Sequence, residues 1–197
     1  MNAPANIQSP SRPIRARLTL GDYYQMSEMG LLDRFARTEL IDGEIIVLNA
    51  LYIPHARTHM RILLALNTSA ERSELPLEVL GELTAELSPF DGPLPDITIL
   101  DSVIAASATQ GAPKAALRLI VEIADSSARR DLGKKRKLYA SRDIPEYWVV
   151  VIPKGTIERF VDPVDGDYKR HDSFAFADAV DSVTLPGVGI PAGTLSA

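Results

Sequence analysis

Hydrophobic positions along the chain follow two different periods, and the change of period predicts the order of strands and helices. Residues 96–100, 117–124 and 146–152 are short runs of mostly apolar side chains, typical of strands that are covered on both faces. After Pro54 and again over about 128–141, apolar residues recur close to every 3.6 positions, which predicts two helices. Strands that alternate with helices predict an α/β (α+β) fold around a central mixed sheet.

Turn and capping residues mark the remaining elements. Thr19, with Asp22 three residues later, predicts the start of a helix, and Asp42-Gly43 predicts a hairpin over 39–48. Asp165-Gly166 predicts a second pair of strands. Residues 1–16 contain three prolines, so we expect a flexible N-terminal arm there. We expect residues 17–197 to form a single domain.

Composition excludes several classes of protein. The 197 residues are 46% hydrophobic and 24% charged, which argues against a wholly disordered chain, a collagen and a long coiled coil. The absence of cysteine excludes disulfides, thiolate nucleophiles and zinc fingers. No apolar run is long enough to span a membrane, so a cytoplasmic protein is expected. The net charge of −5 argues against nucleic-acid binding through the overall field, although it leaves room for a local basic groove.

Two acidic residues occupy positions at which an apolar strand does not favour a charge. Asp96 follows Pro95 at the start of one apolar run, and Glu122 lies inside another. A carboxylate in such a strand is costly unless it is paired or binds a metal. Taken alone, Asp96 also fits a turn residue at a strand start, and Glu122 an exposed position on an edge strand. Together they predict two carboxylates that adjacent strands bring to one edge of the sheet.

The predicted helix over about 128–141 adds a lysine to this pair. At 100° per residue, Lys135 falls among the apolar positions that face the core. It then needs a partner, unless its stem carries the ammonium out to solvent. Asp131, four residues earlier, fits either an intrahelical ion pair or a residue that orients another side chain. The outward basic side chains are expected to form a solvated face: Arg130, Lys134 and Lys137.

Five short motifs then occur in the order of a known bacterial family. They are ELIDGE at 39–44, PD at 95–96, VEIADSS at 121–127, DLGKK at 131–135 followed by LYA, and IPEYW at 144–148. With these motifs the sequence resembles the Uma-two-type putative restriction endonucleases, which belong to the PD-(D/E)XK nuclease superfamily, from about Thr19 to Ile190. The resemblance implies a restriction-endonuclease-like core, in which helices flank a central mixed sheet.

The resemblance also implies roles for three residues. Asp96 matches the aspartate of the superfamily motif, and Glu122 matches its second acid. The motif has a lysine two residues after that acid, where this sequence has alanine. In some variants the lysine moves to the following helix, and Lys135 matches that position.

Four further candidates match positions of the same family or lie close to such a position in the sequence. Glu44 matches an additional acid that the family keeps near its start, and Glu39 is a second candidate in the same motif. His55 matches a histidine at the start of the second helix, and His59 lies one turn later. We predict a catalytic role for Glu44 and treat His55 and Glu39 as peripheral, together with Asp131 of the helix that carries Lys135.

The implied activity is endonucleolytic hydrolysis of phosphodiester bonds, with DNA favoured over RNA as substrate. Asp96 and Glu122 would hold Mg²⁺, or Mn²⁺ in its place, because such ions prefer oxygen ligands and keep several waters. The metal would activate water and polarise the phosphate, and Lys135 would orient that water or neutralise developing charge. Six basic residues between 129 and 137 would form a local positive rim, so weak and salt-sensitive binding is expected.

Two other readings of the sequence remain open. The first is a non-cleaving module with a nuclease fold that binds nucleic acid or a protein partner. The second is a homodimer without a ligand, in which the apolar run 147–152 forms the contact, although burial of that run inside the sheet is the favoured alternative.

Overall fold

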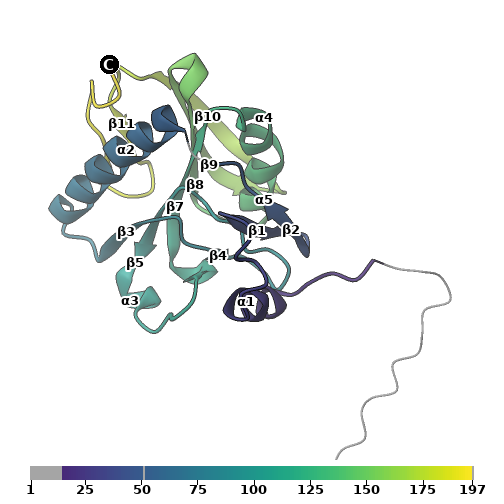
Figure 1. Ribbon diagram of the computed structural model, residues 1–197. Coiled ribbons are helices and arrows are strands. Elements are labelled where there is room, and N and C mark those ends of the chain that lie inside the picture. The colour runs from purple at the N-terminus through teal and green to yellow at the C-terminus, as the bar shows by residue number, and fades with distance from the viewer. Residues whose placement is uncertain (1–14, 51, 197) are drawn as a thin grey trace, which may run out of the picture.

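A central sheet of six strands organises the structure (Figure 1), a computed structural model that describes residues 15–50 and 52–196. Its strands are β3 (Leu77–Gly81), β5 (Ile97–Asp101), β7 (Leu117–Ala124), β8 (Glu146–Val151), β9 (Thr156–Val164) and β10 (Asp167–Ala175). They lie in the order β10-β9-β8-β7-β5-β3. Strands β7 and β8 pair in parallel, and the other neighbouring pairs are antiparallel. This arrangement confirms the predicted mixed sheet.

Helices and short strand pairs surround this sheet. The helices are α1 (Leu20–Glu28), α2 (Ile53–Arg72), α3 (Ser102–Ala105), α4 (Ala128–Arg130) and α5 (Arg136–Ser141), with 3₁₀ turns η1 (Lys114–Ala116) and η3 (Ile152–Lys154) and a π turn, η2 (Asp131–Lys135). The short pairs are β1 (Thr38–Ile41) with β2 (Glu44–Val47), β4 (Ala85–Glu86) with β6 (Ala112–Pro113), and β11 (Val180–Asp181) with β12 (Gly189–Ile190). In Figure 1, α2 lies on one side of the sheet and α4 and α5 on the other.

Alternation along β7 separates two apolar cores. Leu119, Val121 and Ile123 face α2, where Ile62 and Leu66 are buried against them. Ile120 and Ala124 face the opposite way, into the core that contains Tyr139 of α5 and Tyr147 of β8. Glu122 shares the face of Ile120 and Ala124, so its side chain leaves the sheet on the side of α4, η2 and α5.

The local signals in the sequence hold in the structure. Thr19 caps α1 through a capping box with Asp22, and Asp42-Gly43 turns the β1–β2 hairpin with both residues at positive φ. Glu122 is not on an edge strand, because β7 lies between β8 and β5. Every residue of β8 is buried, so the apolar run that starts at Tyr147 lies inside the sheet and does not form an exposed contact face.

The predicted arm over residues 1–16 lies outside the described residues, except for its last two positions. The single domain over 17–197 stays a prediction. Within the described ranges, no helix has both the length and the apolar composition needed to cross a bilayer.

Candidate active site

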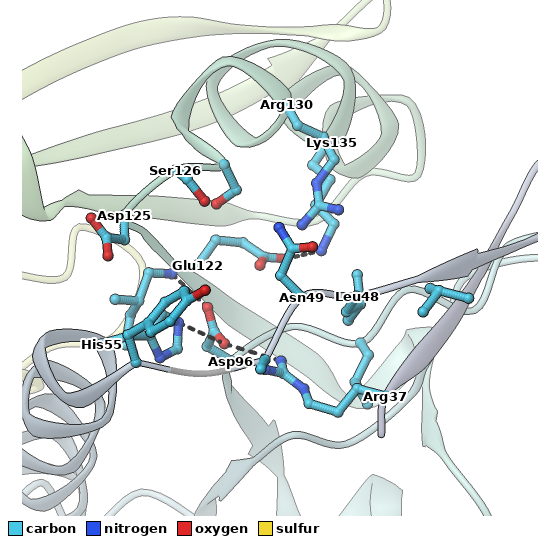
Figure 2. A pocket seen from close by; sticks show the side chains of 16 residues that line it. Arg37, Leu48, Asn49, His55, Asp96, Glu122, Asp125, Ser126, Arg130 and Lys135 are labelled. Carbon is cyan, nitrogen blue, oxygen red and sulfur yellow. Dashed lines mark hydrogen bonds and ion pairs between the residues drawn. The ribbon is translucent and has the colours of Figure 1, made fainter. Parts of the chain in front are cut away.

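Asp96, directly before β5, lies next to Glu122 on the neighbouring strand β7. Ile97 of β5 pairs with Val121 of β7 in antiparallel register, so the residue before Ile97 stands opposite the residue after Val121. The two residues are only 4% and 3% exposed, and Figure 2 shows their side chains directed into one pocket. The structure thus brings together the two acids that the sequence singles out.

The carboxylate of Asp96 is held by three donors. Its Oδ2 accepts a hydrogen bond of 2.7 Å from the backbone N–H of Ile123. Its Oδ1 lies 3.3 Å from Nε2 of His55 and 3.5 Å from Nη2 of Arg37. Burial works to raise the pKa of Asp96, but the hydrogen bonds and nearby positive charge outweigh it and hold the pKa below its ordinary value. Asp96 is therefore ionised at neutral pH.

The pKa of Glu122 is shifted in the opposite direction from that of Asp96. Within the described part of the chain, its two hydrogen bonds both end on Oε1, from Nζ of Lys135 at 2.8 Å and from the hydroxyl of Tyr139 at 2.7 Å. Oε2 is then the oxygen that remains for a ligand in the pocket. Burial raises the pKa of Glu122 to about 8, against the opposing charge of Lys135 and with the help of neighbouring carboxylates. A cation in the pocket would favour the ionised form.

Lys135 forms ion pairs with two acidic residues. Its Nζ lies 2.8 Å from Oε1 of Glu122 and 2.9 Å from Oε2 of Glu39. The lysine is 3% exposed, so its ammonium does not reach solvent along the helix surface. Burial works to lower the pKa of Lys135, but the negative charges of Glu122 and Glu39 outweigh it and raise the pKa. Lys135 therefore places a positive charge in the wall of the pocket.

The π turn η2 directs Lys135 inward. This wider turn buries both Asp131 and Lys135, and π turns of this kind are frequent at functional sites. The carboxylate of Asp131 accepts hydrogen bonds from the hydroxyl of Ser127 and from Nε of Arg130, and its backbone carbonyl accepts one from the hydroxyl of Tyr147. Asp131 thereby anchors the turn that carries Lys135.

Of the two acids in the predicted hairpin, Glu39 is the one beside this cluster. It is 1% exposed and pairs with Lys135 and, at 3.7 Å, with Nη1 of Arg130. Glu44 begins β2, faces solvent and pairs with Arg15 at 3.3 Å. The structure therefore does not bring Glu44 to the other predicted site residues.

Both histidines of α2 contact Asp96, at different atoms. His55 is buried and approaches the carboxylate, whereas Nε2 of His59 lies 2.9 Å from the backbone carbonyl oxygen of Asp96. His55 also lines the pocket. His55 therefore contacts Asp96, a predicted metal ligand, and its predicted peripheral role is compatible with this position.

The pocket has a volume of about 210 Å³ and contains two arginines that sequence patterns do not indicate. Arg37 lies in the loop before β1, where no periodicity applies, and it bridges Asp96 and Glu82. Arg130 was expected on the solvated face of its helix. It instead lines the pocket beside Lys135 (Figure 2). The pocket thus combines buried acids with a cationic wall.

Comparison with known proteins gives this pocket a context. The model of the Uma2 family, described as "putative restriction endonuclease", matches residues 20–193. The chain belongs to this family. The match confirms the resemblance that the five motifs indicate. A search of curated protein sequences found no match.

One solved structure has a fold similar to that of this chain. It is a crystal structure of a putative nuclease belonging to DUF820 from Anabaena variabilis ATCC 29413. The two chains are 16% identical and superpose with a TM-score of 0.67, over 90% of this chain and 97% of the other. At this identity the likeness supports the restriction-endonuclease-like fold and does not assign an activity.

Membership of the Uma2 family implies a divalent metal, and the donors in the pocket fit one kind of ion. Among residues 15–50 and 52–196, no three His, Asp or Glu side chains form a cluster that would hold an ion alone. Mg²⁺ needs only one or two carboxylates because it keeps several waters, so Asp96 and Glu122 suit it. An ion that demands four protein ligands, such as structural zinc, does not fit this donor set.

Proposed function

We propose that this protein is a Mg²⁺-dependent endonuclease that hydrolyses phosphodiester bonds in DNA. The observation that carries the proposal is the buried pair Asp96, directly before β5, and Glu122, on the neighbouring strand β7, with the ammonium of Lys135 at 2.8 Å from Glu122. Each carboxylate faces the pocket, and Oε2 of Glu122 accepts no hydrogen bond within the described residues, so the pair offers oxygen ligands of the kind that a divalent ion prefers. Family membership and the nuclease fold support the same activity.

In the proposed site, Asp96 and Glu122 hold the metal, and the backbone carbonyl of Ile123 is a third candidate ligand at the pocket wall. A divalent cation bound there would lower the pKa of a water ligand and polarise the scissile phosphate. The N–H of Ile123 and the side chains of His55 and Arg37 fix the orientation of Asp96, so that this ligand does not have to reorganise.

Lys135 has a separate role. An ammonium has three N–H donors, and Glu122 and Glu39 take two of them. The remaining N–H can donate to the attacking water or to a phosphate oxygen on which charge develops. Glu39 forms the second ion pair of Lys135 and so acts as a positioning residue.

The test is nicking of supercoiled plasmid with Mg²⁺ or Mn²⁺. We expect cleavage by the wild type and a loss of about 100-fold or more in Asp96→Asn, Glu122→Gln and Lys135→Met, because each removes a metal ligand or the only buried ammonium at the described site. Glu78→Gln is a matched control, since Glu78 is an exposed acid on β3 of the same sheet. It should cleave at the wild-type rate.

Two outcomes would contradict the proposal. One is cleavage that continues at the same rate in EDTA, and the other is wild-type nicking by the three site variants. If folded wild type binds DNA and cleaves neither DNA nor RNA with either metal, the non-cleaving module is the correct alternative. A homodimer stays a prediction, which sedimentation of the wild type tests.

A further inference from the structure

A groove lined by basic side chains leads away from the active-site pocket over the outer side of α4, η2 and α5. It shares Ser126, Ser127 and Arg130 with the pocket, so the two hollows are continuous. Lys134 and Lys137 line this groove and also the next hollow, toward Arg142. The surface beside the candidate scissile position is therefore hollowed in one direction along the helix.

Three of the four basic side chains in this groove are not neutralised by the described part of the protein, whereas Arg130 pairs with Glu39 and Asp131. Arg129, Lys134 and Lys137 are exposed, and none of the three pairs with a carboxylate in the described part of the chain. By contrast, Arg136 on the same helix pairs with Asp167 at 2.9 Å, and Arg142 pairs with Asp91 at 2.7 Å. In a chain of net charge −5, three unpaired cations on one groove form a local positive surface.

The segment between β2 and α2 gives the pocket a rim of different character. Its described residues 48–50 and 52, together with Val47 at the end of β2, line the pocket and carry no charge. Val47 is 49% exposed and Tyr52 is 67% exposed, so this neutral rim presents an aliphatic and an aromatic side chain to solvent. A polyanion that enters the pocket therefore finds unpaired positive charge on the helix side and none on this segment.

Gly133 provides an independent observation in the same groove. It lies inside η2, where glycine lowers helix stability relative to alanine. A Cβ at this position would meet nothing within 4 Å, so packing does not require glycine. Gly133 lines the groove between Lys134 and Arg129, and the missing side chain allows a ligand to approach the helix backbone closely.

We propose that this groove binds the phosphate backbone of the substrate strand next to the scissile phosphate, so that nucleic acid leaves the active site over η2 and α5. Arg129, Lys134 and Lys137 contact successive phosphates, and Gly133 lets the backbone lie close to the helix. The inference rests on the proposed function, because it takes the Asp96–Glu122 pocket as the point of cleavage.

The test compares two triple variants that have the same net charge. Arg129→Ala/Lys134→Ala/Lys137→Ala removes the groove cations, and Arg72→Ala/Lys154→Ala/Lys169→Ala removes three exposed cations that line neither the pocket nor the groove. Binding is measured by fluorescence anisotropy in EDTA, with a labelled 30-base-pair duplex and with the single strand of the same length, at several salt concentrations.

The groove variant should bind at least about tenfold more weakly than the wild type at low salt. Its plot of log affinity against log salt should be shallower by about 2 to 3 for the duplex, since each lost phosphate contact removes close to 0.9 from the slope. The control variant should lose less than threefold. Equal losses in the two triple variants would overturn the proposal, because they would reflect net charge and not the groove.

Gly133→Ala adds a readout that a purely structural role would not give. The substitution should raise the midpoint of thermal unfolding, since alanine favours a helix and has room there, and should weaken binding at least threefold. Higher stability with unchanged binding would contradict close approach at Gly133.

The two proposals fail separately. If the wild type cleaves and the groove variant binds and cleaves like the control, the groove is irrelevant and the active site stands. If no metal supports cleavage but the groove variant alone loses binding, the groove stands and the catalytic proposal fails.

Discussion

The ammonium of Lys135 lies 2.8 Å from Oε1 of Glu122, and neither side chain is more than 4% exposed. A buried ion pair of this kind contributes little net stability, because desolvation of both groups offsets their attraction. Here the attraction does not even restore the ordinary acidity of the carboxyl, whose pKa burial raises to about 8. The pair therefore fixes geometry while leaving Glu122 ready to exchange a proton for a metal.

Replacement of Lys135 should destabilise the protein in a pH-dependent way. Lys135→Met leaves Glu39 and Glu122 buried without their shared cation, which costs about 3–5 kcal/mol when both are ionised. Because the pKa of Glu122 is about 8, the carboxyl is protonated at pH 6 and the loss should be smaller there than at pH 9. Urea unfolding at the two pH values measures the difference. An equal loss at both would show that the pair is not electrostatically important.

Mg²⁺ binding should tighten as the pH rises through 8. A metal ligand must be deprotonated, and below its pKa of about 8 the carboxyl of Glu122 holds a proton that the ion has to displace. Between pH 7 and pH 9 the affinity should therefore increase about tenfold. Calorimetric titration of the wild type tests this, and Glu122→Gln should show weaker and pH-independent binding. A pH-independent wild type would exclude Glu122 as a ligand.

Glu39 and Glu44 lead to opposite expectations. Glu39→Gln removes the charge that holds Lys135 at 2.9 Å, so plasmid nicking should fall at least about tenfold. Glu44→Gln changes an exposed residue that pairs with Arg15, and the geometry predicts a change of less than twofold. Nicking rates of the two variants, measured side by side, decide between them. A larger loss for Glu44→Gln would support the role that the family motif implies and would contradict the geometric assignment.

The hydroxyl of Tyr139 should matter for stability and for the acidity of Glu122. It donates a hydrogen bond of 2.7 Å to Oε1, and Tyr139→Phe removes it while keeping the buried ring. A hydrogen bond to a charged group contributes about 1.5–3 kcal/mol. The free energy of unfolding at pH 9 should therefore decrease by that amount in the variant. Because the lost bond favours the ionised carboxyl, the pH midpoint of metal binding should move upward. An unchanged midpoint would mean that the hydroxyl of Tyr139 does not contribute to the acidity of Glu122.

The sequence could predict Asp96, Glu122 and Lys135 because each interrupts a regular apolar pattern. An acid inside a buried strand, or a lysine on the core side of a helix, is costly, so its presence indicates a partner. The burial of β7 and β8 was also predictable, since the nearly continuous apolar runs at 117–124 and 146–152 are typical of strands that are covered on both faces.

Glu39 and Glu44 could not be distinguished in this way. In the hairpin register Glu39 pairs with Ile46 and Glu44 pairs with Ile41, so alternation places both acids on the same face. Only distance from the turn separates them: Glu44 is adjacent to the turn and faces solvent, whereas Glu39 lies under α4 and η2. That difference depends on tertiary packing, as does the position of Arg37 in its loop.

A π turn contains one residue more than a turn of α-helix, and η2 occurs between two short α-helical segments. Deletion of Gly133 would allow an ordinary helix over 128–141, and the helical segments on either side would keep nearly the same rotation about the axis, because the wider turn absorbs the extra residue. The spacing would change only inside the turn, where Asp131 and Lys135 would be three residues apart and not four. The placement of Lys135 beside Glu122 and Glu39 therefore depends on one inserted residue, whose loss would disturb the site in a chain that keeps every acid and base.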